Sequence, residues 1–179
     1  MSSSSVLVIS DSHGNIAALT TALKWACNAD IHAAAFLGDG YEDLNLASAR
    51  AGFDLPWHTV RGNGDFSYSI PDDLAVEISA RKLFLAHGNR HNVREGHKTI
   101  AAAARNAGAE AALFGHTHVP YCATVNGMFL LNPGSIGRPR SDAGCTFAVL
   151  DCPNSGPLAA RFFRLIQSGR ENTVEELKL

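Results

Sequence analysis

The chain has 179 residues, of which 46% are apolar, and this suits one globular domain over residues 1–179 with a sizeable core. Its formal net charge is −2 and no basic stripe stands out, so electrostatic binding to nucleic acid has no support. The short polar start and the short apolar runs indicate neither a signal peptide nor a membrane span, and we expect a cytoplasmic protein. The four cysteines form no CxxC pair, which predicts reduced thiols.

The first part of the chain alternates short apolar runs with helical segments. Strands are expected at 6–10, 32–37 and 57–61, with helices near 15–28 and 41–51 between them. This βαβαβ order predicts a parallel sheet.

The middle of the chain contains a hairpin and an alanine-rich helix. After a loop at 65–74, strands are expected at 74–79 and 82–87. The helix near 95–107 ends at Gly108, which suits a C-cap.

The last third of the chain is typical of short strands joined by turns. The expected strands are 111–115, 121–125, 128–131, 145–150 and 160–165. Asn126-Gly127 is a strong hairpin signal. The strands after 111–115 predict a second, mostly antiparallel sheet, and residues 168–179 are expected to end as a frayed helix.

Five of the expected strands end at residues that can ligate a metal ion. In chain order these are Asp11 with His13, Asp39, Asn63, His87, and His116 with His118. In open α/β sheets, ligands bind beyond the carboxyl ends of the strands, so we expect the five loops to meet at one edge. Two aspartates, four histidines and one asparagine are too many for one ordinary metal ion and about right for two.

Two pairs of these residues are separated by a single position. In extended backbone, residues i and i+2 point to the same side, so Asp11 could reach the same ion as His13, and His116 the same ion as His118. The alternative for Asp11 is that it caps the next helix, with Gly14-Asn15 as the turn.

The other three candidates are weaker when each is taken alone. Asp39 and Asn63 each lie between glycines, which is typical of a turn, and His87 alone is typical of a structural histidine. Their common position at strand ends favours a metal site.

The segments SDSHG, GDG, RGNGD, AHGN, GHTH and NPGS occur in the order found in calcineurin-like metallophosphoesterases. The chain resembles most closely the small single-domain phosphodiesterases of bacteria and archaea, over residues 10–135. The resemblance implies a four-layer α/β sandwich, in which two packed mixed sheets are flanked by helices.

The resemblance also implies a binuclear metal centre. One ion would be held by Asp11, His13 and His118, the other by Asn63, His87 and His116, with Asp39 bridging both. Carboxylate and imidazole ligands without thiolate suit divalent transition-metal ions, Mn²⁺ before Fe, Ni²⁺, Co²⁺ or Zn²⁺. A hydroxide shared by the two ions would attack a phosphodiester, and Asn63 would also orient the phosphoryl group.

Two positions depart from the family pattern. Gly64 stands where the family usually has a histidine or cysteine that can protonate the leaving group, and Asn89 stands where a second histidine often occurs. His91 could replace these groups as a catalytic residue, or it could be a solvated loop histidine. Gly64 is also expected to serve a positive φ in a tight turn. Asp65 would orient a ligand histidine or a loop amide.

The residues after the last motif have structural and functional alternatives. Residues 132–135 are expected to form a structural turn rather than a substrate contact, and Arg138 and Arg140 are either solvated charges or phosphate ligands. A serine hydrolase using Ser10 or Ser135 is disfavoured because neither lies in a nucleophile elbow.

The leading hypothesis is a metal-dependent phosphodiesterase or phosphatase that acts on a small phosphate ester. The alternative is a catalytically weak metal-binding scaffold on the same fold, and Gly64 favours it. A related retromer subunit is such a scaffold, but it lacks some of the histidines present here. The sequence leaves open the physiological substrate and whether the chain forms a homo-oligomer.

Overall fold

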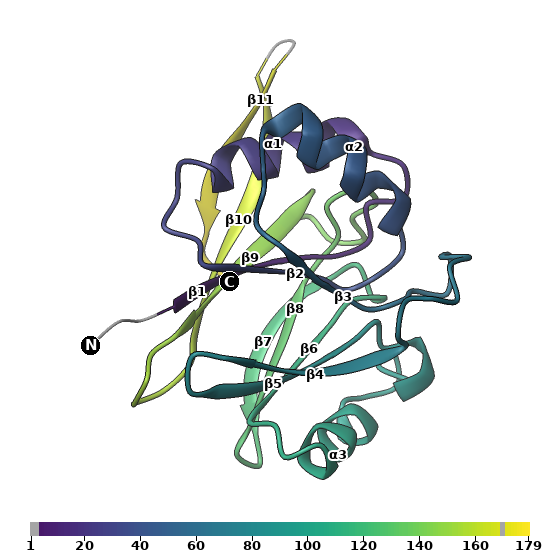
Figure 1. Cartoon of the computed structure of the whole chain (residues 1–179), viewed down its shortest axis with the longest axis vertical. Helices are drawn as coiled ribbons and strands as arrows, with labels where there is room; N and C mark the ends of the chain where they lie inside the picture. The colour runs from purple at the N-terminus through teal and green to yellow at the C-terminus, as the bar shows by residue number, and fades with distance from the viewer. Residues whose placement is uncertain (1–3, 169–170) are drawn as a thin grey trace.

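Two β-sheets pack face to face in the computed structural model, and helices cover their outer faces (Figure 1). The structure describes residues 4–168 and 171–179, so the first three residues of the polar start lie outside it. The arrangement of layers is the predicted four-layer α/β sandwich.

The first sheet has six strands in the order β11-β10-β9-β1-β2-β3. Its parallel part and the two connecting helices are β1 (Ser4–Ile9), α1 (Ile16–Ala26), β2 (Ala33–Phe36), α2 (Tyr41–Ala51) and β3 (Trp57–Thr59). β1 pairs with β2 and β2 with β3, both in parallel, so the predicted βαβαβ unit is confirmed.

Three late strands extend this first sheet on the other side of β1. They are β9 (Thr146–Cys152), β10 (Ala159–Ser168) and β11 (Glu171–Leu177), all antiparallel to their neighbours. The prediction that strands 145–150 and 160–165 belong to the second sheet is therefore wrong. β1 is central and buried along Val6–Ile9, so it needs a partner strand on both sides.

The predicted C-terminal helix is also wrong, because β11 occupies most of 168–179, of which residues 169 and 170 lie outside the described part. Thr173 and Val174 pair with Ile166 and Leu165 of β10. Val174 packs against the apolar cluster between α1 and the first sheet, as Trp25 does. Strand pairing with a buried neighbour therefore outweighs the polar composition of the segment.

The second sheet has five strands in the order β4-β5-β6-β8-β7. Their bounds are β4 (Asp73–Ile78), β5 (Arg81–Ala86), β6 (Ala111–Phe114), β7 (Pro120–Val125) and β8 (Met128–Pro133). β5, β6 and β8 are parallel and only the two outer pairs are antiparallel, so this sheet is mixed rather than mostly antiparallel. A crossover through α3 (Lys98–Asn106) joins β5 to β6 and makes them parallel.

Three apolar clusters hold the layers together. One lies between the two sheets, one between the first sheet and α1 and α2, and one between the second sheet and α3. The strands of both sheets are thereby fixed so that the loops after β1, β2, β5 and β6 can meet. Within the described ranges, no helix is long and apolar enough to cross a membrane.

Leu85 tests the packing between the sheets, since it is fully buried in that cluster. We expect Leu85→Ala to lower the free energy of unfolding by about 2–5 kcal/mol, because the lost contacts leave a cavity. Urea unfolding of the metal-free protein measures this. Leu46→Ala is the control, since Leu46 is 43% exposed on α2, and it should change the free energy by about 0.5 kcal/mol or less. Equal losses in both variants would contradict this packing.

Candidate metal centre

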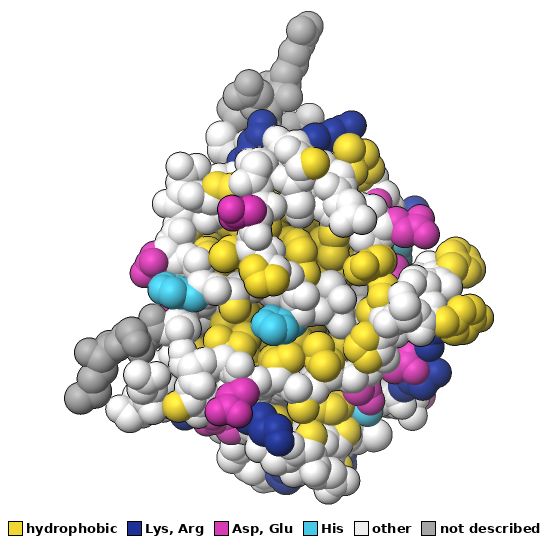
Figure 2. Space-filling view, viewed as in Figure 1, with side chains coloured by type: hydrophobic (Ala, Val, Ile, Leu, Met, Phe, Trp, Pro, Cys, Tyr) yellow, Lys and Arg dark blue, Asp and Glu magenta, His cyan; other side chains and the backbone are white. Residues whose placement is uncertain are grey.

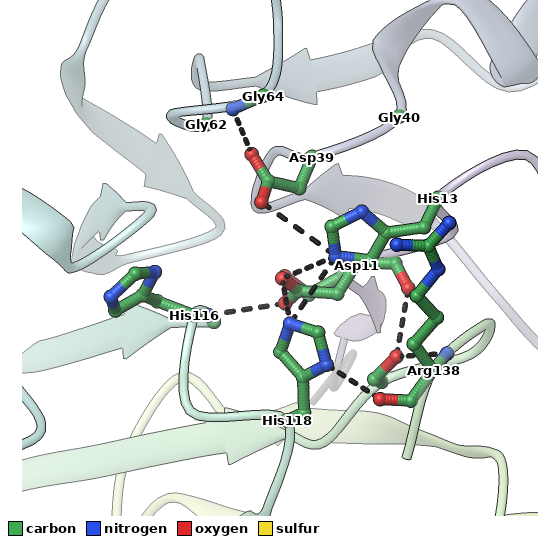
Figure 3. A network of polar contacts seen from close by, with 12 residues as sticks. Asp11, His13, Asp39, Gly40, Gly62, Gly64, His116, His118 and Arg138 are labelled. Atoms are coloured by element: carbon green, nitrogen blue, oxygen red, sulfur yellow. Dashed lines mark hydrogen bonds and ion pairs between the residues drawn. The ribbon is translucent and has the colours of Figure 1, made fainter. Parts of the chain in front are cut away.

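Acidic and histidine side chains from loops of both sheets meet beyond the carboxyl ends of their strands (Figure 3). The loops after β1 and β2 belong to the first sheet, and those after β5 and β6 to the second. The predicted convergence of strand ends therefore occurs, but between two sheets rather than along one edge.

The first group consists of Asp11, His13 and His118, whose ligand-type atoms all lie within 4.8 Å of one another. His118 Nε2 is 3.0 Å from Asp11 Oδ1, and His13 Nε2 is 3.7 Å from the same oxygen. The two Nε2 atoms are 3.2 Å apart. These three residues are the predicted ligands of one ion.

The second group consists of Asp11, Asp39 and His87, again within 4.8 Å. Asp39 Oδ2 is 3.6 Å from His87 Nε2 and 3.7 Å from His13 Nε2, so this carboxylate of the second group also faces a histidine of the first. His116 borders the second group, with Nδ1 at 3.2 Å from His87 Nε2. The sequence did not indicate that Asp11 belongs to both groups.

Backbone carbonyls orient two of the imidazole rings. His87 Nδ1 donates to Leu37 O at 2.7 Å, and His118 Nδ1 donates to Arg138 O at 2.5 Å. A carbonyl oxygen only accepts, so each Nδ1 carries a proton and Nε2 of each ring faces the cluster, where it would be the atom available to a metal ion. Such support is typical of metal-ligating histidines.

Asp11 is the strongest indication that the site is built for a cation. Burial by itself would raise the pKa of this fully buried carboxyl group, but contacts with His118 and His13 hold the pKa well below its usual range. Asp11 is thus ionised, and although its Oδ1 lies 3.0 Å from His118 Nε2, this oxygen accepts no well-aligned hydrogen bond within the described part of the chain. A buried ionised oxygen that faces imidazole nitrogens fits a bound metal ion.

Five of the candidate ligands adopt left-handed backbone conformations, which are uncommon outside glycine. They are Asp11, His13, Asp39, His116 and His118, with φ between 46° and 66°. The expectation that extended backbone aligns residues i and i+2 is therefore wrong. Both members of each pair are left-handed instead, a strain that costs roughly 1–3 kcal/mol per residue and is typical of functional sites. Asp11 and His13 still lie in one group, whereas His118 contacts Asp11 and His116 contacts His87.

Asp11 is not a helix cap either. Asn15 is the N-cap of α1, and its Oδ1 accepts from the Ala18 amide at 3.1 Å. The carboxylate of Asp11 is instead contacted by Ser10 Oγ and the His116 amide.

Asp65 links two of the loops that form the site. Its carboxylate accepts from the amides of Asp39, Gly40, Tyr41 and Gly62, each at 2.8–3.0 Å. Of the two predicted roles, the one as a partner of loop amides is confirmed. Burial alone would raise the pKa of this carboxyl group, but the four amides lower it.

We expect Asp65→Asn to lower the free energy of unfolding by about 1.5–3 kcal/mol near pH 7, because an amide nitrogen would face backbone donors. The lowered pKa of Asp65 means that its carboxylate stabilises the fold above the unfolded value of about 4. The difference between the two proteins should therefore shrink as the pH falls below about 4. Urea unfolding from pH 7 to pH 3.5 measures it, and Asp142→Asn, at an exposed position, is the control.

Residues 132–135 support the ligand loops, which confirms their structural role, although the first two of them belong to β8 rather than to the predicted turn. Asn132 Nδ2 donates to Gly115 O at 2.7 Å and to Thr117 Oγ1 at 3.0 Å, and Ser135 Oγ donates to Asp11 O at 2.8 Å. Ser10 and Ser135 are fully buried, so neither offers an accessible nucleophile.

The two predicted catalytic residues differ in their position relative to the cluster. Asn63 is exposed in the loop between Gly62 and Gly64, next to Asp39. His91 is 8% exposed, and its Nε2 lies 3.0 Å from Asp73 Oδ1, so it is not a solvated histidine. In the part of the chain that the structure describes, no contact joins His91 to the metal ligands. Its catalytic role stays a prediction, as does phosphate binding by the exposed Arg138 and Arg140.

Gly64 does not have the expected positive φ. Its amide donates to Asp39 Oδ1 at 2.6 Å, and a Cβ at this position would lie 3.2 Å from the same oxygen. Glycine therefore lets the loop approach Asp39 closely, so that Oδ2 of Asp39 faces the histidines.

Comparison with known proteins places the chain among phosphoesterases. The profile of the calcineurin-like phosphoesterase superfamily domain matches residues 5–155. The probable metallophosphoesterase YsnB of Bacillus subtilis (strain 168) is 30% identical over 97% of this chain and 96% of its own length. Phosphodiesterase YfcE of Escherichia coli (strain K12) is 25% identical over 82% of this chain and 86% of its own. Vps29 of Chaetomium thermophilum superposes with a TM-score of 0.77 at 19% identity, covering 98% of this chain and 96% of that one, and shows a shared fold.

Proposed function

Since this chain belongs to the calcineurin-like phosphoesterase superfamily, we propose that it is a metal-dependent phosphodiesterase with two metal sites. One observation carries the proposal. Oδ1 of buried, ionised Asp11 faces His13 and His118 of one group without a well-aligned hydrogen bond in the described part of the chain, and Asp39 of the second group also faces His13. The name of the relative YfcE supports phosphodiesters as the substrate class.

We assign the ligands as the resemblance implies, with one addition from the geometry. One ion would be held by Asp11, His13 and His118 and the other by Asn63, His87 and His116, with Asp39 shared by both. Asp11 is the addition, because it belongs to both groups of candidate ligands. When bound, divalent ions such as Mn²⁺ supply Lewis acidity and a water-derived nucleophile near neutral pH. The cytoplasmic location and the single domain stay predictions.

The chain itself contributes charge and orientation. Asp11 and Asp39 bring two negative charges to the cluster, which neutralise only part of the charge of two divalent ions. The loaded site is therefore positive and attracts a phosphate ester. The carbonyls of Leu37 and Arg138 fix the histidine rings, and the Gly64 amide fixes Asp39, so the ligands need little rearrangement.

The absence of a side chain at Gly64 predicts a steep dependence on the leaving group. A general acid typically contributes about 10²–10⁴ in rate, and Gly64 cannot supply a proton. Aryl phosphodiesters should therefore be cleaved much faster than alkyl ones. A series of leaving groups of graded pKa, measured on the wild type and on His91→Ala, tests this.

If His91 donates the proton despite its contact with Asp73, the dependence will be shallow in the wild type and steeper in His91→Ala. A flat dependence in both proteins, with chemistry shown to be rate-limiting, would mean that another residue protonates the leaving group.

Gly64 also favours a second candidate function, a metal-binding scaffold with little turnover. Metal analysis combined with a phosphodiester assay, with and without chelator, separates the two functions. The enzyme loses hydrolysis with chelator and regains it with Mn²⁺, whereas the scaffold binds metal but shows no chelator-sensitive hydrolysis.

A further inference from the structure

The loop between β3 and β4 exposes two aromatic side chains beside the candidate metal centre. Phe66 is 86% exposed and Tyr68 is 91% exposed. Figure 1 shows this loop projecting from the body of the protein, and Figure 2 shows hydrophobic side chains at its tip. Exposure of two large rings within three residues is costly in water, and next to a candidate active site it indicates a binding surface.

The base of the loop is held in place by polar contacts. The Arg61 amide donates to Pro71 O at 2.8 Å, and the Arg61 guanidinium pairs with Asp72 at 2.6 Å. The same guanidinium lies 5.0 Å from the centre of the Tyr68 ring. Tyr68 thus has a partner within the protein, whereas no ring or cation contact is described for Phe66.

Phe66 shares a cavity with two of the candidate metal ligands. The cavity is about 220 Å³ and is lined by His13 and Asp39 on one side and by Phe66 and Ser67 on the other. A phosphoryl group held at the metal centre would therefore place one of its ester groups near the Phe66 ring. The size suits one such group rather than an oligonucleotide.

The charges of the cavity restrict what this ester group can be. Its lining includes Glu42, Asp43 and Asp65 but no lysine or arginine. Asp43 accepts from Ser12 Oγ and the Gly14 amide, and Asp65 accepts from loop amides, whereas no partner is described for Glu42. A second phosphate on this ester group would be repelled by the negative side chains and would find no cationic side chain in the lining to pair with. An uncharged group with a planar ring fits better, because it can stack on Phe66.

We propose that Phe66 is a specificity-determining residue that stacks on the base of a nucleoside, so that the substrates are phosphodiesters with a nucleoside as one ester group. A nucleoside combines an uncharged planar base with a sugar that separates the base from the phosphate. The proposal rests on the proposed phosphodiesterase function and names its substrate class.

Two substrates with the same leaving group test the proposal kinetically. They are thymidine 5′-(p-nitrophenyl phosphate) and methyl p-nitrophenyl phosphate, assayed with the Mn²⁺-loaded protein. The ratio of their kcat/KM values should fall about tenfold in Phe66→Ala, as expected for the loss of one base–aromatic stack. The ratio should be retained in Phe66→Tyr, which keeps a ring. It should also be retained in Tyr68→Ala, because Tyr68 lies over Arg61 and does not line the cavity.

A binding measurement separates failure of this inference from failure of the proposed function. Calorimetry should show that thymidine 5′-monophosphate binds the Mn²⁺-loaded protein more tightly than methyl phosphate, and that Phe66→Ala removes about tenfold of this preference. Hydrolysis of both diesters with an unchanged ratio in Phe66→Ala would overturn the inference alone. Absence of hydrolysis, together with Phe66-dependent nucleotide binding, would overturn the phosphodiesterase function and its substrates while keeping Phe66 as a stacking residue. Absence of both would overturn both.

Discussion

Replacing Asp39 by alanine should abolish nearly all hydrolysis of an aryl phosphodiester, with a loss of about 10³-fold or more, equivalent to about 4 kcal/mol of barrier. The reason is the position of its carboxylate, whose Oδ2 lies 3.7 Å from His13 Nε2 and 3.6 Å from His87 Nε2. A ligand between both groups supports both ions, so metal content after dialysis should fall well below that of the wild type. The assay is hydrolysis of bis(p-nitrophenyl) phosphate with added Mn²⁺.

Two further variants make this result interpretable. Asp39 has a φ of 59°, a conformation that asparagine tolerates better than alanine, so Asp39→Asn separates loss of charge from backbone strain. Asp142→Asn removes an exposed carboxylate and should change neither activity nor metal content. Activity within about tenfold of the wild type in both Asp39 variants would show that Asp39 is not shared by the two sites.

Substitution of Asp11 by asparagine should remove the stabilisation that the protein gains from metal. A ligand that binds only the folded state stabilises it by about 2.7 kcal/mol when its concentration is 100 times its Kd. Asp11 belongs to both candidate groups, so Asp11→Asn should lose most of this gain and most of the hydrolysis. The measurement is urea unfolding with Mn²⁺ and with chelator, alongside the diester assay.

The control for this experiment is Asp30→Asn, because the Asp30 side chain is 95% exposed and lies outside both groups. It should keep the full effect of Mn²⁺ on stability. If Asp11→Asn were stabilised by Mn²⁺ as strongly as the wild type, the buried carboxylate would not be a metal ligand.

Much of the fold could be predicted from the sequence because it is encoded locally. The predicted helix 41–51 coincides with α2, and the predicted strands of the first part coincide with β1, β2 and β3 to within a few residues. The Asn126-Gly127 turn also forms, with φ of 50° and 77°. Apolar periodicity and turn residues are properties of short segments, so they can be interpreted without the rest of the chain.

Sheet membership could not be predicted in this way. β9 pairs with β1 across more than 130 residues of sequence and β10 pairs with β9, and β11 is a strand although its residues are mostly polar. Pairing between distant segments depends on which edges the rest of the fold leaves open, and no local pattern records this.

The same distinction between local sequence and tertiary structure applies to the candidate metal centre. By itself the sequence determined the chemical types at the strand ends, carboxylates and imidazoles without thiolates, and hence the kind of ion they suit. Only the tertiary structure decided how these groups lie. In the folded protein five candidate ligands adopt left-handed conformations, and carbonyls distant in the sequence orient His87 and His118. The Gly64 amide donates to Asp39. These contacts join residues from separate loops of two sheets, and they exist only once the packed cores have brought those loops together.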